Sequence, residues 1–345
     1  MFKTVVAALA CGLVSSAAAA QACNGYSQLC GKTFDNVAFP STHNSFAYGN
    51  SAAATQSVNI DMQLQAGVRG LMLDIQYKDS TNSSKPYLCH TECTVLNAGP
   101  LVDELQKIRA FMDGNADEVV TIFIKNNGPF SAEAIAQAFA QARLDKYAYT
   151  PKAGAWPTLQ TMIAQNKRLV VFVDGGSDTS VPWLAYDKDY VVQTPYLVPP
   201  YRPFGCSPMT AVRPLWIMNR FVSERLFPDK DFDFPVANEA GTVNTFPGIV
   251  EQAEICGSAG HFPNFIVVDF FYEGALFEAV AHINNVTLAS LTTSAASATA
   301  VSSAATKTTL PAVLTLTSAA EPCSLLNHTA LMAALVVGTL LVAFI

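Results

Sequence analysis

Short runs of consecutive apolar residues alternate along this chain with stretches that have helical spacing. The apolar runs predict seven strands, over Asn36–Pro40, Val68–Gln76, Val119–Lys125, Arg168–Asp174, Tyr190–Thr194, Leu215–Phe221 and Phe265–Phe271. The stretches between them predict helices over Leu101–Met112, Ala132–Arg143, Thr158–Gln165 and Ala275–Ile283. Because several strand runs are apolar at consecutive positions, they are typical of parallel strands buried on both faces.

This order of elements predicts an α/β fold, either a barrel or a doubly wound sheet. The dinucleotide-binding variety is disfavoured, because no Gly-x-Gly-x-x-Gly follows the first strand. No internal repeat of about 20–50 residues is evident, which argues against solenoids and propellers. The expected folded unit, residues 23–286, has the size of a single (β/α) barrel.

The first twenty residues read as a secretory signal peptide, residues 1–20. Lys3 supplies the charged start, Val5–Val14 the apolar run, and Ala18–Ala20 the small residues of a cleavage site. The apolar run is too short to span a bilayer. We therefore expect a secreted protein.

The last residues, 321–345, have the order of a GPI-attachment signal. A polar spacer, Glu321–His328, precedes the uncharged apolar tail Leu331–Ile345. Small residues stand before the spacer, with Ser318 as the expected anchor site. The alternative is a single transmembrane helix, for which a tail of about 15 residues is short against the roughly 20 that a span needs. The expected location is the outer face of the plasma membrane or the cell wall.

Residues 287–320 are mostly Ser, Thr, Ala and Val, with Lys307 as the single charge. Such a segment cannot build a core and is typical of an O-glycosylated stalk. Asn82 and Asn285 stand in Asn-x-Ser/Thr sequences and are expected to be exposed glycosylation sites.

Composition narrows the function classes. Half of the chain is hydrophobic and 14% is charged, which excludes a disordered chain and a coiled coil. There are 20 Lys and Arg against 27 Asp and Glu, a net charge of −7, whereas nucleic-acid binders carry a basic excess. We expect a monomer that meets a membrane through its anchor.

The cysteines predict disulfides. Two of the eight lie in the leader and the tail, and six remain for the folded unit: Cys23, Cys30, Cys89, Cys93, Cys206 and Cys256. An even number in a secreted chain implies disulfides, and we expect local pairing of neighbours along the chain. A metal site is the alternative, but these spacings match no common zinc pattern.

Polar side chains stand where the predicted strands end. They are His43 and Asn44 after the first strand, Asp74, Lys125 and Asp174 at the ends of the next three, and Asp269 near the end of the last. His90 lies in the loop after the second strand, between two cysteines. The carboxyl ends of parallel barrel strands meet at one mouth, so we expect these residues to converge there.

Two histidines at one mouth suit a reaction that needs a general base and a general acid near neutral pH. Asp269 could orient one of them and stabilise its charged form. Lys125 could supply a cation for a phosphate. Asp174 has two equal readings, a ligand for substrate hydroxyls or a cap for the next turn. Arg69 lies at the start of its strand, and we interpret it as structural.

Five segments carry a resemblance to a known family. They are Pro40–Ser45, Gly67–Asp74, Leu88–Thr91, Thr121–Lys125 and Pro263–Phe270. In this order and spacing they resemble the X-domain of phosphatidylinositol-specific phospholipases C, over about residues 25–275. The variety they look most like is the secreted, anchored branch found in plants and fungi.

The resemblance implies a single distorted TIM-like (β/α) barrel, the fold of PLC-like phosphodiesterases. It also implies attack by the inositol 2-hydroxyl, with diacylglycerol and a cyclic inositol phosphate as products. By position, His43 resembles the general base, His90 the general acid, and Asp269 the carboxylate paired with the first histidine. Asn44 and Asp74 match positions that hold calcium in the eukaryotic enzymes.

The chain departs from that eukaryotic pattern at Met72 and Lys125, where those enzymes have acidic residues. Calcium takes six to eight oxygens, and Lys125 would repel it. We therefore expect no cofactor, with Lys125 as the cation and with Asp74 paired to it or touching substrate. The alternative is a weak calcium site built from Asn44, Asp74 and backbone oxygens.

Three functions stay open. The first is a phosphoric diester hydrolase acting on an inositol phospholipid or a GPI-type glycolipid headgroup. The second is a phosphodiesterase with another phospholipid substrate, against which Met72 and Lys125 argue. The third is a non-catalytic cell-surface recognition module on the same barrel. Retention of His43, His90 and Asp269 favours an enzyme, and the lost acidic positions favour the module.

Overall fold

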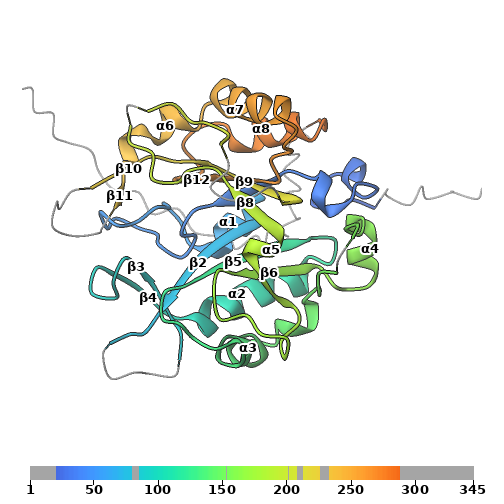
Figure 1. The fold of residues 1–345 in the computed structure, drawn as a ribbon, viewed down its shortest axis with the longest axis vertical. Helices are drawn as coiled ribbons and strands as arrows, with labels where there is room; N and C mark the ends of the chain where they lie inside the picture. The colour runs from blue at the N-terminus through green and yellow to red at the C-terminus, as the bar shows by residue number, and fades with distance from the viewer. Residues whose placement is uncertain are drawn as a thin grey trace, which may run out of the picture. The chain divides into compact units, whose positions relative to one another are not determined.

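Eight strands run parallel in one sheet, in the order β7-β6-β5-β2-β1-β12-β9-β8 (Figure 1). They are β1 (Phe39–Thr42), β2 (Gly70–Gln76), β5 (Val120–Asn126), β6 (Leu169–Val173), β7 (Leu184–Tyr186), β8 (Val191–Gln193), β9 (Leu215–Arg220) and β12 (Phe265–Val268). Neighbours in the sheet are neighbours along the chain, and β12 returns to β1. This is the topology of a (β/α) barrel, opened between β7 and β8.

The computed structural model describes residues 21–79, 85–152, 154–200, 202–207, 213–225 and 233–287. The expected leader, Asn82, nearly all of the stalk, Ser318 and the apolar tail lie outside these residues. Within them, no helix is long and apolar enough to cross a membrane.

The seven strands predicted from the sequence are present in the sheet with shifted ends, and the structure adds β7 and the short strands of two hairpins. β1 begins at Phe39 rather than Asn36, because Phe34–Asn36 forms a 3-10 turn that delays the strand. β7 was not predicted: it has three residues, and a single turn of helix, α5 (Asp187–Tyr190), separates it from β8. A run that short has no clear periodicity.

The helices cover the outside of the barrel (Figure 1). The longer ones are α1 (Ile60–Ala66), α2 (Leu101–Gly114), α3 (Ala132–Gln141), α4 (Leu159–Ala164), α7 (Phe246–Ser258) and α8 (Leu276–Ile283), and α6 (Ala240–Val243) is one turn. Four of them were predicted. The missed α7 carries a regular start signal, since the Thr245 hydroxyl accepts a hydrogen bond from the Gly248 amide and Pro247 stands in the first turn.

Two antiparallel hairpins extend the barrel beyond the carboxyl ends of its strands. β3 (Tyr87–His90) pairs with both β2 and β4 (Leu96–Pro100). β10 (Ser223–Glu224) pairs with β11 (Phe234–Pro235). Both hairpins therefore stand beside the mouth.

Both faces of the strands are buried, as their consecutive apolar residues predicted. On β2, Leu71, Leu73 and Ile75 pack outward into the helix layer. The interior holds several aromatic rings among aliphatic side chains, with Phe265 stacked on Phe39 and set edge-on against Phe123. The barrel is therefore a packed core, and space for a ligand is left at its end.

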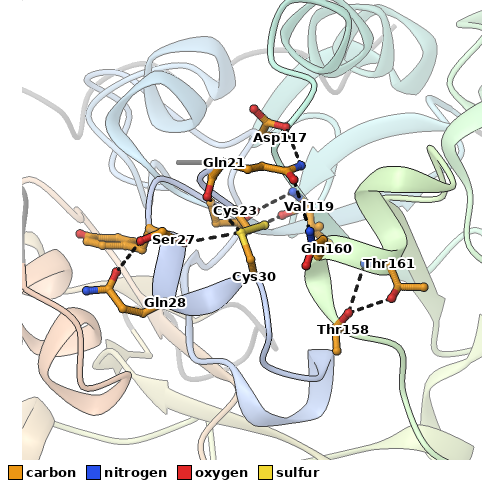
Figure 2. Close-up of a disulfide and its surroundings, with 12 residues drawn as sticks. Gln21, Cys23, Ser27, Gln28, Cys30, Asp117, Val119, Thr158, Gln160 and Thr161 are labelled. Carbon is orange, nitrogen blue, oxygen red and sulfur yellow. Dashed lines mark hydrogen bonds between the residues drawn. A yellow bond between two sulfur atoms is a disulfide. The ribbon is translucent and has the colours of Figure 1, made fainter. Parts of the chain in front are cut away.

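An amino-terminal segment closes the end of the barrel opposite the mouth. The Cys23–Cys30 disulfide holds its turn together (Figure 2). The Asn24 side chain exchanges two hydrogen bonds with the backbone of Val119, just before β5. The Leu159 amide, at the start of α4, donates to the Lys32 carbonyl.

The structure contains three disulfides, Cys23–Cys30, Cys89–Cys93 and Cys206–Cys256, which is the local pairing expected from the sequence. The six cysteines of the folded unit are thereby used. Asn285, the glycosylation candidate that the structure describes, is exposed directly after α8. Its modification stays a prediction.

Candidate active site

A cavity of about 260 Å³ opens at the carboxyl ends of the strands. Six of the residues singled out from the sequence line it: His43, Asn44, Asp74, His90, Lys125 and Asp269. Strand register explains this convergence, because each of these residues except His90 ends or follows a parallel strand.

His43 and Asp269 are brought together by the register of β1 and β12. Thr42 lies opposite Val268, so the next residue on each strand projects from the same point of the mouth. The His43 Nδ1 lies 2.9 Å from the Asp269 Oδ1. Because the carboxylate only accepts, Nδ1 carries the proton and Nε2 is left as a free acceptor. Burial raises the pKa of Asp269, and the neighbouring His43 opposes that rise.

Phe221 stacks on the His43 ring, with centroids 4.0 Å apart and planes 7° apart. This contact and the bond to Asp269 together fix the orientation of the imidazole. Phe221 follows β9 and lines the cavity. The sequence offered one signal for it, its place at the end of a predicted strand, but apolar residues are far more often core than site.

His90 is placed by a strand and not, as expected, by a loop. It is the last residue of β3, where the β3–β4 hairpin folds back over the mouth. Its Nδ1 donates to the Ala53 carbonyl at 2.6 Å, which leaves Nε2 free. The two imidazole centroids lie 6.4 Å apart at 81°. Burial, and then the nearby His43, lower the pKa of His90 below its usual 6.5.

Lys125 and Asp74 face one another from β5 and β2. They are register partners, and the Lys125 Nζ lies 3.6 Å from the Asp74 Oδ2. The Asp74 charge raises the pKa of Lys125, so the ammonium stays charged at neutral pH. The Asn127 amide also donates to the Asp74 Oδ2, at 3.5 Å. Half of the Lys125 side chain is exposed, so its ammonium can meet a ligand.

Asp174 lies apart from the other candidates. Its Oδ1 accepts a hydrogen bond from the backbone N–H of Asn126 at 2.7 Å. Asp174 does not line the cavity that the described residues form. The contact with Asn126 joins the end of β6 to the end of β5, 48 residues away along the chain, so it matches neither the cap of the next turn nor a ligand contact.

Arg69 is structural, as interpreted. It pairs with Glu118 and donates to the carbonyls of Leu64 and Val68, at the amino end of β2. Its partner lies in the loop before β5.

Left-handed backbone marks three points of the site. The residues that directly follow His43, His90 and Asp269 are Asn44, Thr91 and Phe270, with φ of 39°, 67° and 46°. Seven non-glycine residues in the described part of the chain have positive φ, and three of them are these. Such conformations cost about 1–3 kcal/mol and cluster at functional sites. The sequence carries no signal for them.

The donor set does not fit a calcium ion. Among the described residues, no group of three or more His, Cys, Asp or Glu side chains is arranged to hold a metal. Of the two calcium-type positions, Asp74 is paired with Lys125. Met72, where an acidic residue stands in the eukaryotic pattern, packs into the barrel interior instead.

A family model described as PI-PLC X matches residues 29–284. The chain belongs to the PI-PLC X family. The PI-PLC X domain-containing protein 1 of Arthroderma benhamiae is 30% identical over 280 residues, which are 76% of this chain and 89% of that protein. An uncharacterized secreted protein of the same fungus is 28% identical over 77% of this chain and 64% of its own length. A PI-PLC X domain-containing protein of Arabidopsis thaliana is 29% identical over 76% of this chain and 65% of its own length. The chain thus spans slightly less than two thirds of these last two relatives.

Solved structures agree on the fold of this PI-PLC X protein. The phosphatidylinositol-specific phospholipase C of Listeria monocytogenes superposes with a TM-score of 0.51 at 14% identity, over 75% of this chain and 97% of that one. A phosphatidylinositol-specific phospholipase C of Staphylococcus aureus gives a TM-score of 0.51 at 12% identity, over 75% of this chain and 95% of that one. At these identities the likeness establishes the barrel, and the predicted distorted TIM-like fold is confirmed.

Proposed function

We propose that this PI-PLC X protein cleaves the phosphodiester of an inositol phospholipid or a GPI-type glycolipid. The observation that supports it most is the pair of imidazoles across one cavity. His43 is oriented by Asp269, His90 is oriented by the Ala53 carbonyl, and each presents a free Nε2. Two such groups on opposite sides of a phosphate can serve as base and acid.

In the proposed reaction, His43 Nε2 takes the proton of the inositol 2-hydroxyl. The freed oxygen attacks phosphorus and closes a cyclic phosphate. The bond from phosphorus to the diacylglycerol oxygen breaks, and His90 Nε2–H protonates that oxygen. Asp269 stabilises the imidazolium that His43 becomes. The substrate loses one proton and its leaving oxygen gains one, and exchange with solvent then removes the proton from His43 and returns one to His90.

Lys125 has the role of neutralising the phosphate. Its charge lies in the cavity wall, and the contact with Asp74 keeps it protonated. Removing one hydrogen-bond donor aimed at developing charge costs about 2.7–4 kcal/mol, and we expect a loss of this order for a cation in the same role. Asn44, buried in the same wall, is proposed to contact the substrate.

A recognition module is the second candidate. One observation favours it: among the described residues that line the cavity, three are carboxylates, Asp74, Asp233 and Asp269, and one is an ammonium, Lys125, while Asp233 also pairs with Arg225. An excess of carboxylates disfavours the transfer of an anionic phosphate, whereas carboxylates can still accept hydrogen bonds from the hydroxyls of a headgroup.

We also propose that the protein is secreted and monomeric, with a GPI anchor at Ser318. Three disulfides suit an oxidising compartment. Expressed in a eukaryotic host, the full chain should partition into detergent and move to the aqueous phase after anchor cleavage. The Ser318→Leu variant should not move from the detergent to the aqueous phase after the same treatment. A wild-type chain that stays in detergent would favour the transmembrane alternative.

The activity is tested by product release from phosphatidylinositol in mixed micelles, with calcium or with a chelator. The wild-type protein should release cyclic inositol phosphate equally in both. His43→Ala and His90→Ala should abolish release, and Lys125→Met should lower it about 100-fold. His282→Ala, an exposed histidine on α8, is the matched control and should be fully active.

Three outcomes would contradict parts of this proposal. Release that requires calcium would overturn the role of Lys125. Product release by the His90→Ala variant would overturn the role of His90 as the general acid. Binding of the micelles with no release, from folded protein, would support the recognition module instead.

A further inference from the structure

Four consecutive residues in the loop between β1 and α1 are almost completely buried. They are Ala53, Ala54, Thr55 and Gln56, here called the clamp segment, each at most 1% exposed. Connecting loops normally run over the surface, because buried backbone and polar side chains need partners. Two of these four residues are polar, so their partners explain why the loop turns inward.

The clamp segment holds the backbone at His43. The Thr55 hydroxyl lies 3.0 Å from the carbonyl oxygens of both His43 and Asn44. The Gln56 Nε2 also donates to the His43 carbonyl, at 3.0 Å. These bonds fix the chain where it turns into the left-handed conformation of Asn44.

The same two residues hold the backbone on either side of Asp269. The Gln56 Nε2 donates to the Val268 carbonyl at 3.1 Å. The Phe270 amide donates to the Thr55 carbonyl at 2.8 Å, and the Phe271 amide to the Gln56 Oε1 at 3.4 Å. One side-chain amide thus joins the loop that carries His43 to the loop that carries Asp269.

The clamp segment also reaches the third residue of the site. The Ala53 carbonyl accepts the hydrogen bond from His90 Nδ1. Three groups that lie far apart in sequence therefore share one tetrapeptide as a neighbour. Strained conformations such as those of Asn44 and Phe270 persist only where the surroundings over-determine them, and the clamp segment bonds to both.

We propose that the clamp segment sets the mutual positions of His43, His90 and Asp269, with Thr55 and Gln56 as positioning residues. Thr55 lines the cavity, but the Thr55 hydroxyl and the Gln56 Nε2 bond to backbone carbonyls and not to the reacting side chains, so each acts through backbone. A displacement of about 1 Å in a reacting group can cost about 100-fold in rate, so loss of these bonds should reduce turnover more than binding.

Gln56→Met tests this against a closely matched control, Gln63→Met. Gln63 is also fully buried, and its amide also makes three hydrogen bonds, to Thr42, Ser45 and Val58. All three lie on the β1–α1 side, so Gln63 does not join the two loops. Both variants should lose similar thermal stability. Gln56→Met should lower kcat about 10- to 100-fold with KM within about twofold, and Gln63→Met should lower kcat severalfold less.

A second measurement does not depend on the proposed activity. The His43 Nδ1 proton, bonded to Asp269, should give a downfield NMR resonance that is absent from His43→Ala. In the full-length protein, Gln56→Met and Thr55→Val should broaden or shift this resonance, and Thr55→Ser, which keeps the hydroxyl, should restore it. Gln63→Met should leave it in place.

The two measurements separate the two proposals, since the kinetic one rests on the proposed function and the spectroscopic one does not. A wild-type protein that is inactive on every phosphodiester, with the resonance lost in Gln56→Met, would contradict the function and support the clamp. A resonance unchanged in both Gln56→Met and Thr55→Val would overturn the clamp. So would equal kcat in the two glutamine variants. If Gln56→Met does not fold, Thr55→Val and Thr55→Ser decide the same question.

Discussion

His90 occupies an environment far from that of a histidine in water. It is buried at the end of β3, its Nδ1 is bound to a carbonyl, and His43 lies beside it. Burial and the neighbouring imidazole both penalise its charged form. At neutral pH the free protein should therefore hold His90 mostly neutral, and an anionic phosphate beside it would favour the protonated, proton-donating form.

This gives a prediction for the titration of His90. Its NMR midpoint should lie below 6.5 in the free protein, because burial and His43 lower the pKa of His90. His43→Ala should raise that midpoint, since it removes one cause and leaves the Asp269 charge uncompensated. Added inorganic phosphate should raise it as well. A wild-type midpoint above 6.5, or a lower one in His43→Ala, would contradict the environment described here.

At the scale of elements, the hairpin β3–β4 places the His90 imidazole beyond the carboxyl ends of the barrel strands. The Cys89–Cys93 disulfide closes the turn around His90, and the Gln76 amide donates to the carbonyls of Cys89 and Thr91. The Cys206–Cys256 disulfide, by contrast, ties α7 to the segment before β9. The two crosslinks should therefore differ in what they contribute.

Loop length predicts the difference in stability. The two disulfides span 4 and 50 residues, and in the chain-entropy treatment the longer loop should contribute about 2 kcal/mol more. Replacing both cysteines of the 206–256 pair by Ala should lower the free energy of unfolding by that much more than replacing the 89–93 pair. The activity order should be reversed, because only the shorter crosslink borders His90. Denaturant titration measures the loss of stability in the two variants, and the release assay measures their loss of activity. If the same variant lost more of both, the two disulfides would not have the separate roles described here.

For the whole molecule, the barrel is interrupted where its helices are shortest. No ladder joins β7 to β8 in the part of the chain that the structure describes, and the connection between them is one turn of helix. The chain after β8 instead reaches the mouth, where Tyr196 and Leu197 line the cavity. At the opposite end, the disulfide-bonded amino-terminal segment bonds to the start of α4. The cavity that holds the two histidines therefore opens at the carboxyl ends of the strands.

The same site costs the molecule stability. Burial raises the pKa of Asp269 above 3.8, so the folded protein binds that proton more tightly than the unfolded chain. Stability should therefore fall as pH rises from 3.8 through the raised value, and stay reduced above it. Asp269→Asn removes the charge and keeps an acceptor for His43 Nδ1. It should raise Tm at pH 7 while lowering kcat about 100-fold or more.

Thermal unfolding between about pH 4 and pH 7 measures this exchange of stability for activity. At the acid end of this range, where the carboxyl is protonated, the Tm of the wild-type protein should equal that of Asp269→Asn. Asp174→Asn is the control, because Asp174 is exposed and outside the cavity, and its Tm should follow the wild type across the range. A variant Asp269→Asn that is less stable than wild type at pH 7 would show that the His43–Asp269 pair stabilises the fold instead.

The sequence by itself determined the alternation of strands and helices, the parallel direction of the strands, and the set of polar residues at strand ends. These features follow from local burial. A strand covered on both faces must be apolar at consecutive positions, so its polar residues stand at its end. Short elements such as β7 lacked enough residues for that signal. The disulfide pairing could also be predicted from the sequence, because each bond joins two cysteines that follow one another along the chain.

Only the tertiary structure decided how those residues act together. The His43–Asp269 bond spans 226 residues and depends on the register of β1 against β12. The stacking of Phe221, the strand that carries His90 and the inward path of the clamp segment likewise depend on which loop meets which at the mouth. Local sequence patterns report whether a residue is buried. They do not report which distant backbone it will face, because that is set by the closure of the whole barrel.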